Sequence, residues 1–196
     1  DMLGNVGPST IQDHIVDSTS PISWKTFDGP TCGDLPQPPG WQLVKTYELM
    51  GSYPEHFEND VIDLSAYAGK TVQLAWRYYS DGEYIGAIDD VVILEDGTPM
   101  YSENFDSYTD DGYYTPGPFP PGWTEISYAT GCYGGSVKHW GAESYKKHSS
   151  PNSMACYYNC PNDDWVMTPW FTFDGGSTYA LDYWYFWDDS WDIYMD

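Results

Sequence analysis

Two adjacent carboxylates, Asp89 and Asp90, have the clearest potential for chemistry, because they stand at the start of an apolar run that continues to Leu94. An acidic break at Asp81 and Gly82 precedes this run. A carboxylate close to a core is costly unless it is paired or bound to a cation. The pair therefore predicts either a structural partner or a cation site on this strand.

The elements that must position the pair are visible as alternating patterns. Apolar and more polar residues alternate over residues 72–78, which indicates a half-buried strand. The segment 63–70 before it is typical of a single helical turn closed by Gly69. The acids thus belong to the second of two neighbouring strands.

Short strand patterns recur along the chain, and Gly- and Pro-rich turns separate them. They cover residues 42–49, 71–79, 88–94, 101–105, 153–158, 170–173, 179–187 and 191–195. Helical periodicity is nowhere sustained. We therefore predict an all-β fold, a jelly-roll-like antiparallel β-sandwich.

The charge balance narrows the range of partners. The chain of 196 residues carries 30 acids and 7 bases, for a formal charge of −23. Nucleic acids and anionic membranes are therefore poor partners, and no apolar run approaches the roughly 20 residues of a membrane span. Cations, basic proteins and neutral glycans remain compatible with this charge.

Four cysteines in a chain with 15 Pro and 19 Gly favour an extracellular, disulfide-bearing protein. No signal peptide is visible at Asp1, so we expect a mature, trimmed or partial chain. Cys156 and Cys160 are the preferred pair because they are close in sequence, which leaves Cys32 with Cys132. The other pairings stay open.

Two groups of segments resemble one known family, the MAM-like jelly-roll modules of the cleaved-adhesin and choice-of-anchor-J type. Residues 62–93, IDLSAYAGKTVQLAWRYYSDGEYIGAIDDVVI, resemble the closing half of such a module. Four later segments resemble the opening half: ENFDSY (103–108), FPPGW (119–123), SPNSMACYYN (150–159) and NDDWVMTPWFTFDGGSTYALDYWYFW (162–187). Such modules occur in gingipain adhesin regions and behind the catalytic domain of immune-inhibitor-A-type metallopeptidases.

The two halves stand in reversed order, with the closing half in residues 1–98 and the opening half in residues 99–196. Joined end to end, they would make one complete module. Three explanations stay open: the chain is cut from a tandem array, it is a permuted domain, or each subunit gives one half to a neighbour. The third explanation predicts a filament unless the geometry closes a ring.

The resemblance implies a structural Ca²⁺ site, because acids at two matching places lie close together in family members. In this chain those acids are Asp89 and Asp90 in the first half, with Glu103 and Asp106 in the second. Ca²⁺ takes roughly 6–8 oxygen ligands, including carboxylates and backbone carbonyls. The alternative is a solvated acidic edge that resists pairing with other strands.

The resemblance also places one face of the aromatic strand 179–187 in the core. Its other face carries Trp184 and Phe186, which would lie outside together with Trp170. Exposed aromatic rows stack on sugar rings or fill protein interfaces. The alternative is that the irregular segment 127–150 covers this face.

Catalytic motifs are absent from the sequence. HExxH and G-x-S-x-G do not occur, so we expect no enzymatic activity. We predict a non-catalytic extracellular adhesion or assembly protein that self-associates and is stabilised by Ca²⁺. The alternatives are a carbohydrate-binding module that uses exposed aromatics, and an accessory β module of a secreted metallopeptidase. The partners implied are a second copy, a glycan or a cell-surface protein.

Overall fold

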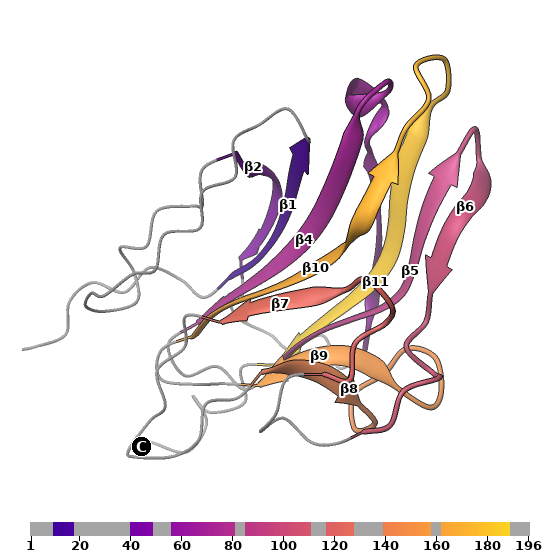
Figure 1. The fold of residues 1–196 in the computed structure, drawn as a ribbon. Helices are drawn as coiled ribbons and strands as arrows, with labels where there is room; N and C mark the ends of the chain where they lie inside the picture. The colour runs from indigo at the N-terminus through magenta and orange to yellow at the C-terminus, as the bar shows by residue number, and fades with distance from the viewer. Residues whose placement is uncertain are drawn as a thin grey trace, which may run out of the picture.

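The computed structural model describes residues 10–17, 40–48, 56–80, 85–110, 117–127, 139–157 and 162–188. In this part of the chain, two antiparallel sheets pack together and enclose a core (Figure 1). The predicted all-β sandwich is therefore confirmed. No helix of the described residues is long and apolar enough to cross a membrane.

Five strands in the order β2-β1-β4-β10-β7 form the first sheet, which we call sheet A. Their bounds are Thr10–Asp17 for β1, Gln42–Glu48 for β2, Thr71–Ser80 for β4, Thr124–Ser127 for β7 and Asn162–Thr172 for β10. β4 lies at the centre of this sheet, between β1 and β10.

Six strands form the second sheet, sheet B, in the order β3-β11-β5-β9-β8, with β6 also paired to β5. Their bounds are Glu58–Asp63 for β3, Ile85–Glu95 for β5, Thr98–Glu103 for β6, Trp140–Glu143 for β8, Ser153–Tyr157 for β9 and Tyr179–Asp188 for β11. A 3₁₀ turn, Ser65–Tyr67 (η1), connects β3 to β4. Gly69 follows it at φ +79°, which agrees with the predicted helical turn closed by a glycine.

Strand β5 has two partners in succession along one edge. Its first part pairs with β9, ending at Ile88 opposite Met154. Its second part pairs with β6, beginning at Val91 opposite Glu103. Asp89 and Asp90 therefore occupy the gap between the two partners, and Asp90 has a positive φ of 47° that kinks the strand there.

The core fills the space between the sheets, and Leu74 and Trp76 of β4 point into it at 2% and 1% exposure. The prediction of a half-buried strand is wrong here, because Ala75 and Arg77 on the other face are also buried, at 1% and 9% exposure. Ala75 packs in a second cluster with Trp41 and Trp165.

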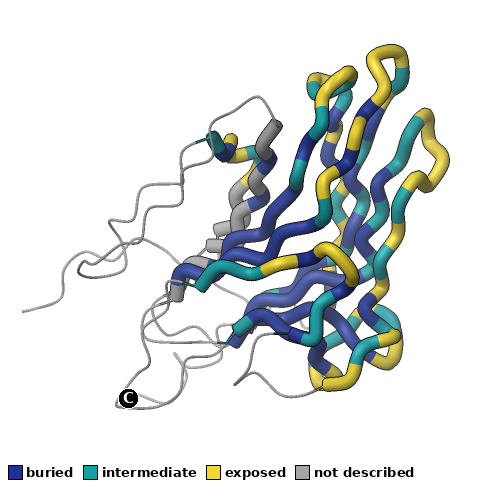
Figure 2. Tube along the Cα trace, viewed as in Figure 1, coloured by how far each residue is buried: buried dark blue, intermediate teal, exposed yellow. Residues whose placement is uncertain are grey.

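From sheet B, Leu181, Tyr183 and Tyr185 of β11 are buried against Leu74 and Trp76. The ring of Tyr183 meets that of Trp76 edge-on at 5.4 Å. Exposed residues gather at the turns that join the long strands (Figure 2).

Both sheets draw strands from both predicted halves of the chain. In sheet A, β4 pairs with β10, and in sheet B, β5 pairs with β11. The sandwich is thus completed within a single chain. Exchange of halves with a neighbouring chain is not needed to build it.

Candidate functional site

A loop of residues 144–150 follows β8 and lies against the gap in β5. The carboxylate of Asp89 holds it: Oδ2 accepts the backbone N–H groups of His148 and Ser149 at 2.8 and 2.9 Å. Its Oδ1 accepts the N–H of Asp90 at 2.7 Å. Burial raises the pKa of Asp89 to about 6, and the N–H of Ser149 partly offsets this rise. Asp89 is therefore the buried anchor of the loop.

Asp90 makes the second set of contacts to the same loop. Its Oδ2 lies 2.6 Å from Nδ1 of His148, and its Oδ1 accepts the hydroxyl of Ser149 at 3.0 Å. The His148 ring also stacks on Trp184, with 3.7 Å between ring centroids and 10° between planes. His148 is thus fixed by a hydrogen bond to Asp90 on one side and by an aromatic ring on the other.

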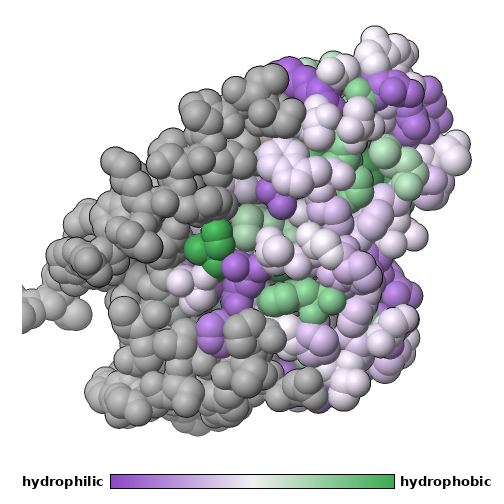
Figure 3. Space-filling view, viewed as in Figure 1, coloured by the Kyte–Doolittle hydropathy of each residue, from purple (hydrophilic) through white to green (hydrophobic). Residues whose placement is uncertain are grey.

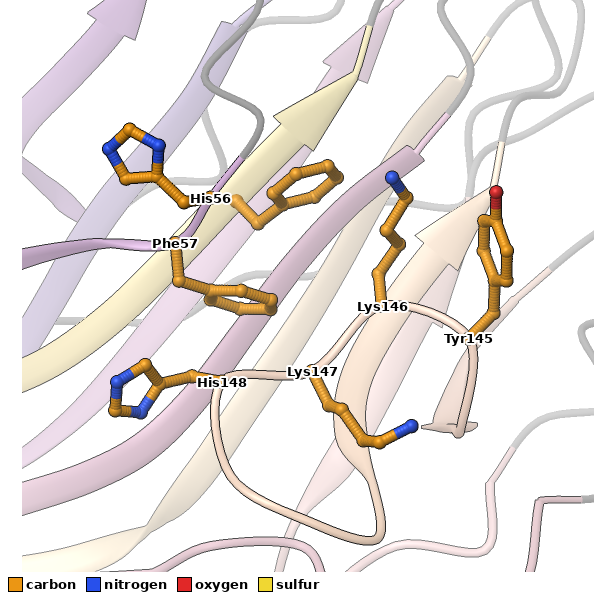
Figure 4. A pocket seen from close by; sticks show the side chains of 7 residues that line it. His56, Phe57, Tyr145, Lys146, Lys147 and His148 are labelled. Atoms are coloured by element: carbon orange, nitrogen blue, oxygen red, sulfur yellow. The ribbon is translucent and has the colours of Figure 1, made fainter.

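The loop borders an open hollow on the outer face of sheet B, the face turned away from the core. This basic hollow has a volume of about 340 Å³, and its lining is His56, Phe57, Tyr145, Lys146, Lys147, His148 and Phe186. Tyr145 and Lys146 extend side by side from the loop (Figure 4). Tyr145 is 64% exposed, whereas Phe57 and Phe186 are 8% and 3% exposed and form the floor.

The charge of the basic hollow differs from that of the rest of the chain. None of the described residues that line it is acidic, although the whole chain has 30 acids and only 7 lysines and arginines. Lys146 Nζ lies 4.6 Å from the ring centre of Phe186 and 5.1 Å from that of Tyr145. Lys147 Nζ donates to the carbonyl of Ser144. Cations and aromatic rings therefore occur together here.

A second hollow, the acidic hollow, lies on the other side of the Asp90–His148 pair. It has a volume of about 460 Å³, and its lining is Asp90, Val91, Val92, Ser102, Glu103, Asn104, Ser107 and Tyr108. Glu103 Oε1 accepts the N–H of Phe105 at 2.9 Å, and its Oε2 lies 3.3 Å from the hydroxyl of Tyr108. Two carboxylates, those of Asp90 and Glu103, thus face one open space.

The four acids predicted for Ca²⁺ do not converge on one point. Asp89 is fully buried and turned toward the loop. Asp106 accepts the N–H of Asn152 at 3.2 Å and the side-chain amide of Asn104 at 2.9 Å. Among the described residues, no group of three or more His, Cys, Asp or Glu is placed to hold a metal. Asp90 and Glu103 are the two of these acids that line one hollow, and the Ca²⁺ site stays a prediction.

The predicted outer aromatics have different surroundings. Trp170 on β10 is 43% exposed. Trp184 and Phe186 lie on the face opposite the core, but His148 covers the first and Lys146 lies over the second. The loop thus covers this face, which was the alternative left open by the sequence.

One of the four cysteines, Cys156, belongs to the described residues. It is buried in β9, and its Sγ lies 3.7 Å from Oδ2 of Asp164. Cys32, Cys132 and Cys160 lie outside the described residues. The Cys156–Cys160 and Cys32–Cys132 pairs stay predictions.

Sequence reasoning did not select the lining residues Tyr145, Lys146 and His148 as a binding site. A signal was present, because much of the small basic complement falls in residues 138–147. It could not show which strand face the segment would cover.

No known protein family matches this chain, and comparison with curated proteins and with solved structures gives no match. The resemblance to MAM-like modules therefore stays a prediction. The class that the fold defines is an antiparallel β-sandwich with two hollows beside one strand of sheet B.

Proposed function

We propose that the chain is a non-catalytic, extracellular adhesion or assembly module that contacts its partner through the basic hollow. One observation carries this proposal: Lys146, Lys147 and the exposed ring of Tyr145 gather at one concave place on a strongly acidic chain. A positive patch on an acidic surface attracts and orients an acidic partner.

The contacts around the hollow favour binding over catalysis. His148 is engaged by Asp90 and Trp184, and Lys147 by the carbonyl of Ser144. These contacts hold the loop in a preformed shape. A preformed surface loses less conformational entropy when it binds a partner.

The view from the side of β7 and β10 supports this choice of surface. On that face, hydrophobic side chains of the described residues form small, separate patches among hydrophilic ones (Figure 3). Broad apolar patches are the usual mark of a protein interface.

We propose a second copy of the chain as the partner, held by local charge complementarity against the net repulsion between two chains of charge −23. The edge strand β3 presents exposed acids, Glu58 and Asp63, which complement the lysines of the hollow. Such a contact joins two different surfaces, so it builds a filament or a ring. Salt screens the repulsion between copies beyond about 8 Å at physiological ionic strength.

Sedimentation velocity tests this proposal. We expect the wild-type chain to associate with rising concentration, and the variants Tyr145→Ala and Lys146→Gln to stay monomeric. Lys70→Gln is the matched control, because Lys70 is an exposed lysine in the turn before β4, away from the hollow lining. Association of both hollow variants to the wild-type extent would contradict the proposal.

Calcium belongs to the proposal in a narrower form than the sequence predicted. We assign it to the acidic hollow, where Asp90 and Glu103 would supply carboxylate oxygens and the neighbouring backbone would supply carbonyls. A bound Ca²⁺ would offset the repulsion between the two carboxylates and stabilise the β5–β6 pair.

A carbohydrate-binding module is the second candidate. The observation that favours it is Tyr145, whose ring is 64% exposed at the edge of the basic hollow. An exposed aromatic ring offers a flat apolar face on which a sugar can stack.

A further inference from the structure

The basic hollow has the size and rigidity of a small-ligand site. Its volume of about 340 Å³ falls in the range of about 300–1,000 Å³ that is usual for ligand pockets. The floor rings of Phe57 and Phe186 pack 5.3 Å apart within a buried cluster on the outer face of sheet B. The wall is loop 144–150, which Asp89 and Asp90 fix to β5.

The chemistry of the hollow joins one accessible ring with positive charge. The Tyr145 ring and Lys146 Nζ lie 5.1 Å apart, a spacing that lets one small ligand touch both. Lysine is a compact point charge, suited to a single anionic group. A ligand that matches this pair has a ring with an apolar face and one negative charge beside it.

We propose that the basic hollow binds an acidic sugar, with the sugar ring stacked on Tyr145 and its carboxylate beside Lys146. This inference rests on one part of the proposed function, that the basic hollow is the contact surface of the module, and it implies that the sugar competes with the β3 acids of a second copy for the same lysines. A densely charged polyanion is a poorer match, since the charge of −23 repels it over the whole surface. A short oligosaccharide interacts electrostatically mainly with the lysines of the hollow, because salt screens charges beyond about 8 Å.

Isothermal titration calorimetry with two matched probes tests the inference. The first probe is a short oligomer of galacturonic acid, and the second is a galactose oligomer of equal length. We expect the acidic oligomer to bind the wild-type chain and the neutral one to bind at least about tenfold more weakly, as expected for loss of a charged hydrogen bond. Binding of both with equal affinity would overturn the inference.

The variants separate this site from general charge effects. Lys146→Gln keeps most of the side-chain length over Phe186, and Tyr145→Ala removes the exposed ring; each should weaken acidic binding about tenfold. Lys70→Gln removes the same charge elsewhere and should have no effect. An equal loss in all three variants would contradict the inference. Circular dichroism and melting temperature report whether each variant is folded.

Failure of the sugar inference can be distinguished from failure of the proposed function. If neither oligomer binds but the hollow variants still abolish self-association, the sugar inference fails and the assembly module stands. If the hollow variants change neither sugar binding nor self-association, both proposals fail. An acidic peptide from β3 that binds the hollow while the acidic oligomer does not would also overturn the inference and leave the proposed function standing.

Discussion

Among the described residues, backbone N–H groups and not cationic side chains hold the carboxylate of Asp89. Three of these N–H groups donate to it, from Asp90, His148 and Ser149. The sequence identified the acidic pair as costly, and the structure gives the physical reason that it is tolerated. The buried carboxylate of Asp89 therefore accepts hydrogen bonds both from the backbone of β5 at its unpaired gap and from the backbone of loop 144–150.

Replacement of Asp89 by Ala should destabilise the fold. The N–H groups of His148 and Ser149 would lose their acceptor, which costs about 3 kcal/mol of unfolding free energy in total. Asp182→Ala is the control, because Asp182 contacts Asn59 in a more exposed place on the same sheet; its cost should stay within about 0.5 kcal/mol. Urea unfolding measures both, and equal losses would contradict the anchor role.

The raised pKa of Glu125 predicts that the stability of the fold depends on pH. Burial raises its pKa from 4.5 to about 7, and burial lowers the pKa of its neighbour His139. Between pH 4.5 and about 7 the folded state holds more protons on Glu125 than the unfolded state does, so stability falls as pH rises. The contribution is fully present below the unfolded pKa and lost above the folded one.

Glu125→Gln isolates this effect, because glutamine keeps the acceptor for the N–H of Trp140 but cannot ionise. From about pH 5 to about pH 8 the variant should gain stability relative to the wild type, by at most about 3 kcal/mol at about 1.4 kcal/mol per pKa unit. Melting temperatures across this range measure the difference. Parallel curves for the two chains would contradict the raised pKa.

The sequence could predict the unusual acids but not their partners. The alternation in residues 72–78 and the aromatic strand are local patterns, so the strands follow from them, but the burial of the second face does not: Ala75 and Phe186 are also buried. The contact of Asp89 with His148 spans 59 positions and is decided by how β8 and β9 pair. No local pattern records this contact, so the loop and both hollows could not be predicted.

At the scale of elements, strand β5 and loop 144–150 form one unit. The loop fills the place on β5 that neither β9 nor β6 occupies. It also separates the two hollows, since His148 lines one and Asp90 lines the other. The loop is therefore the element whose order controls both surfaces.

Trp184→Ala should loosen the loop without unfolding the sandwich. The change removes the ring beneath His148 and costs about 2 kcal/mol. Hydrogen exchange of the His148 and Ser149 amides should become faster. Trp170→Ala is the control, because Trp170 is 43% exposed on the other sheet. If both variants leave exchange in the loop unchanged, the stacking contributes nothing to its order.

Calcium should stabilise the β5–β6 pair through Glu103. We expect Ca²⁺ to raise the wild-type melting temperature, with a gain of about 2.7 kcal/mol at a concentration a hundred times the dissociation constant. Glu103→Gln should abolish the gain, while Asp106→Asn should keep it, because Asp106 faces Asn152. If Glu103→Gln and Asp106→Asn both lose the rise in melting temperature with Ca²⁺, the four-acid site predicted from the sequence would be favoured.

At the scale of the whole molecule, the two predicted halves depend on each other. β4 and β5 come from the first half, and their partners β10 and β11 come from the second. Neither half can bury its apolar faces alone. The choice among a tandem fragment, a permuted domain and exchange of halves stays a prediction.

Separate expression of residues 1–98 and 99–196 tests this dependence. Each fragment alone should lack a cooperative unfolding transition, because the strands that cover its aromatic residues are missing. Mixing the fragments should restore the transition, as measured by near-ultraviolet circular dichroism. A fragment that unfolds cooperatively on its own would contradict the shared core.

The pairing of β4 with β10 also sets a delay during synthesis. Thr71 meets Thr172 across the sheet, 101 positions later in the chain. At about 5–20 residues per second, the ribosome needs roughly 5–20 s to supply that partner. During this interval β4 has only the earlier strands β1 and β2 as sheet neighbours, and Trp76 lacks the ring of Tyr183 in β11 that later packs against it. The nascent chain is then most open to binding by a chaperone.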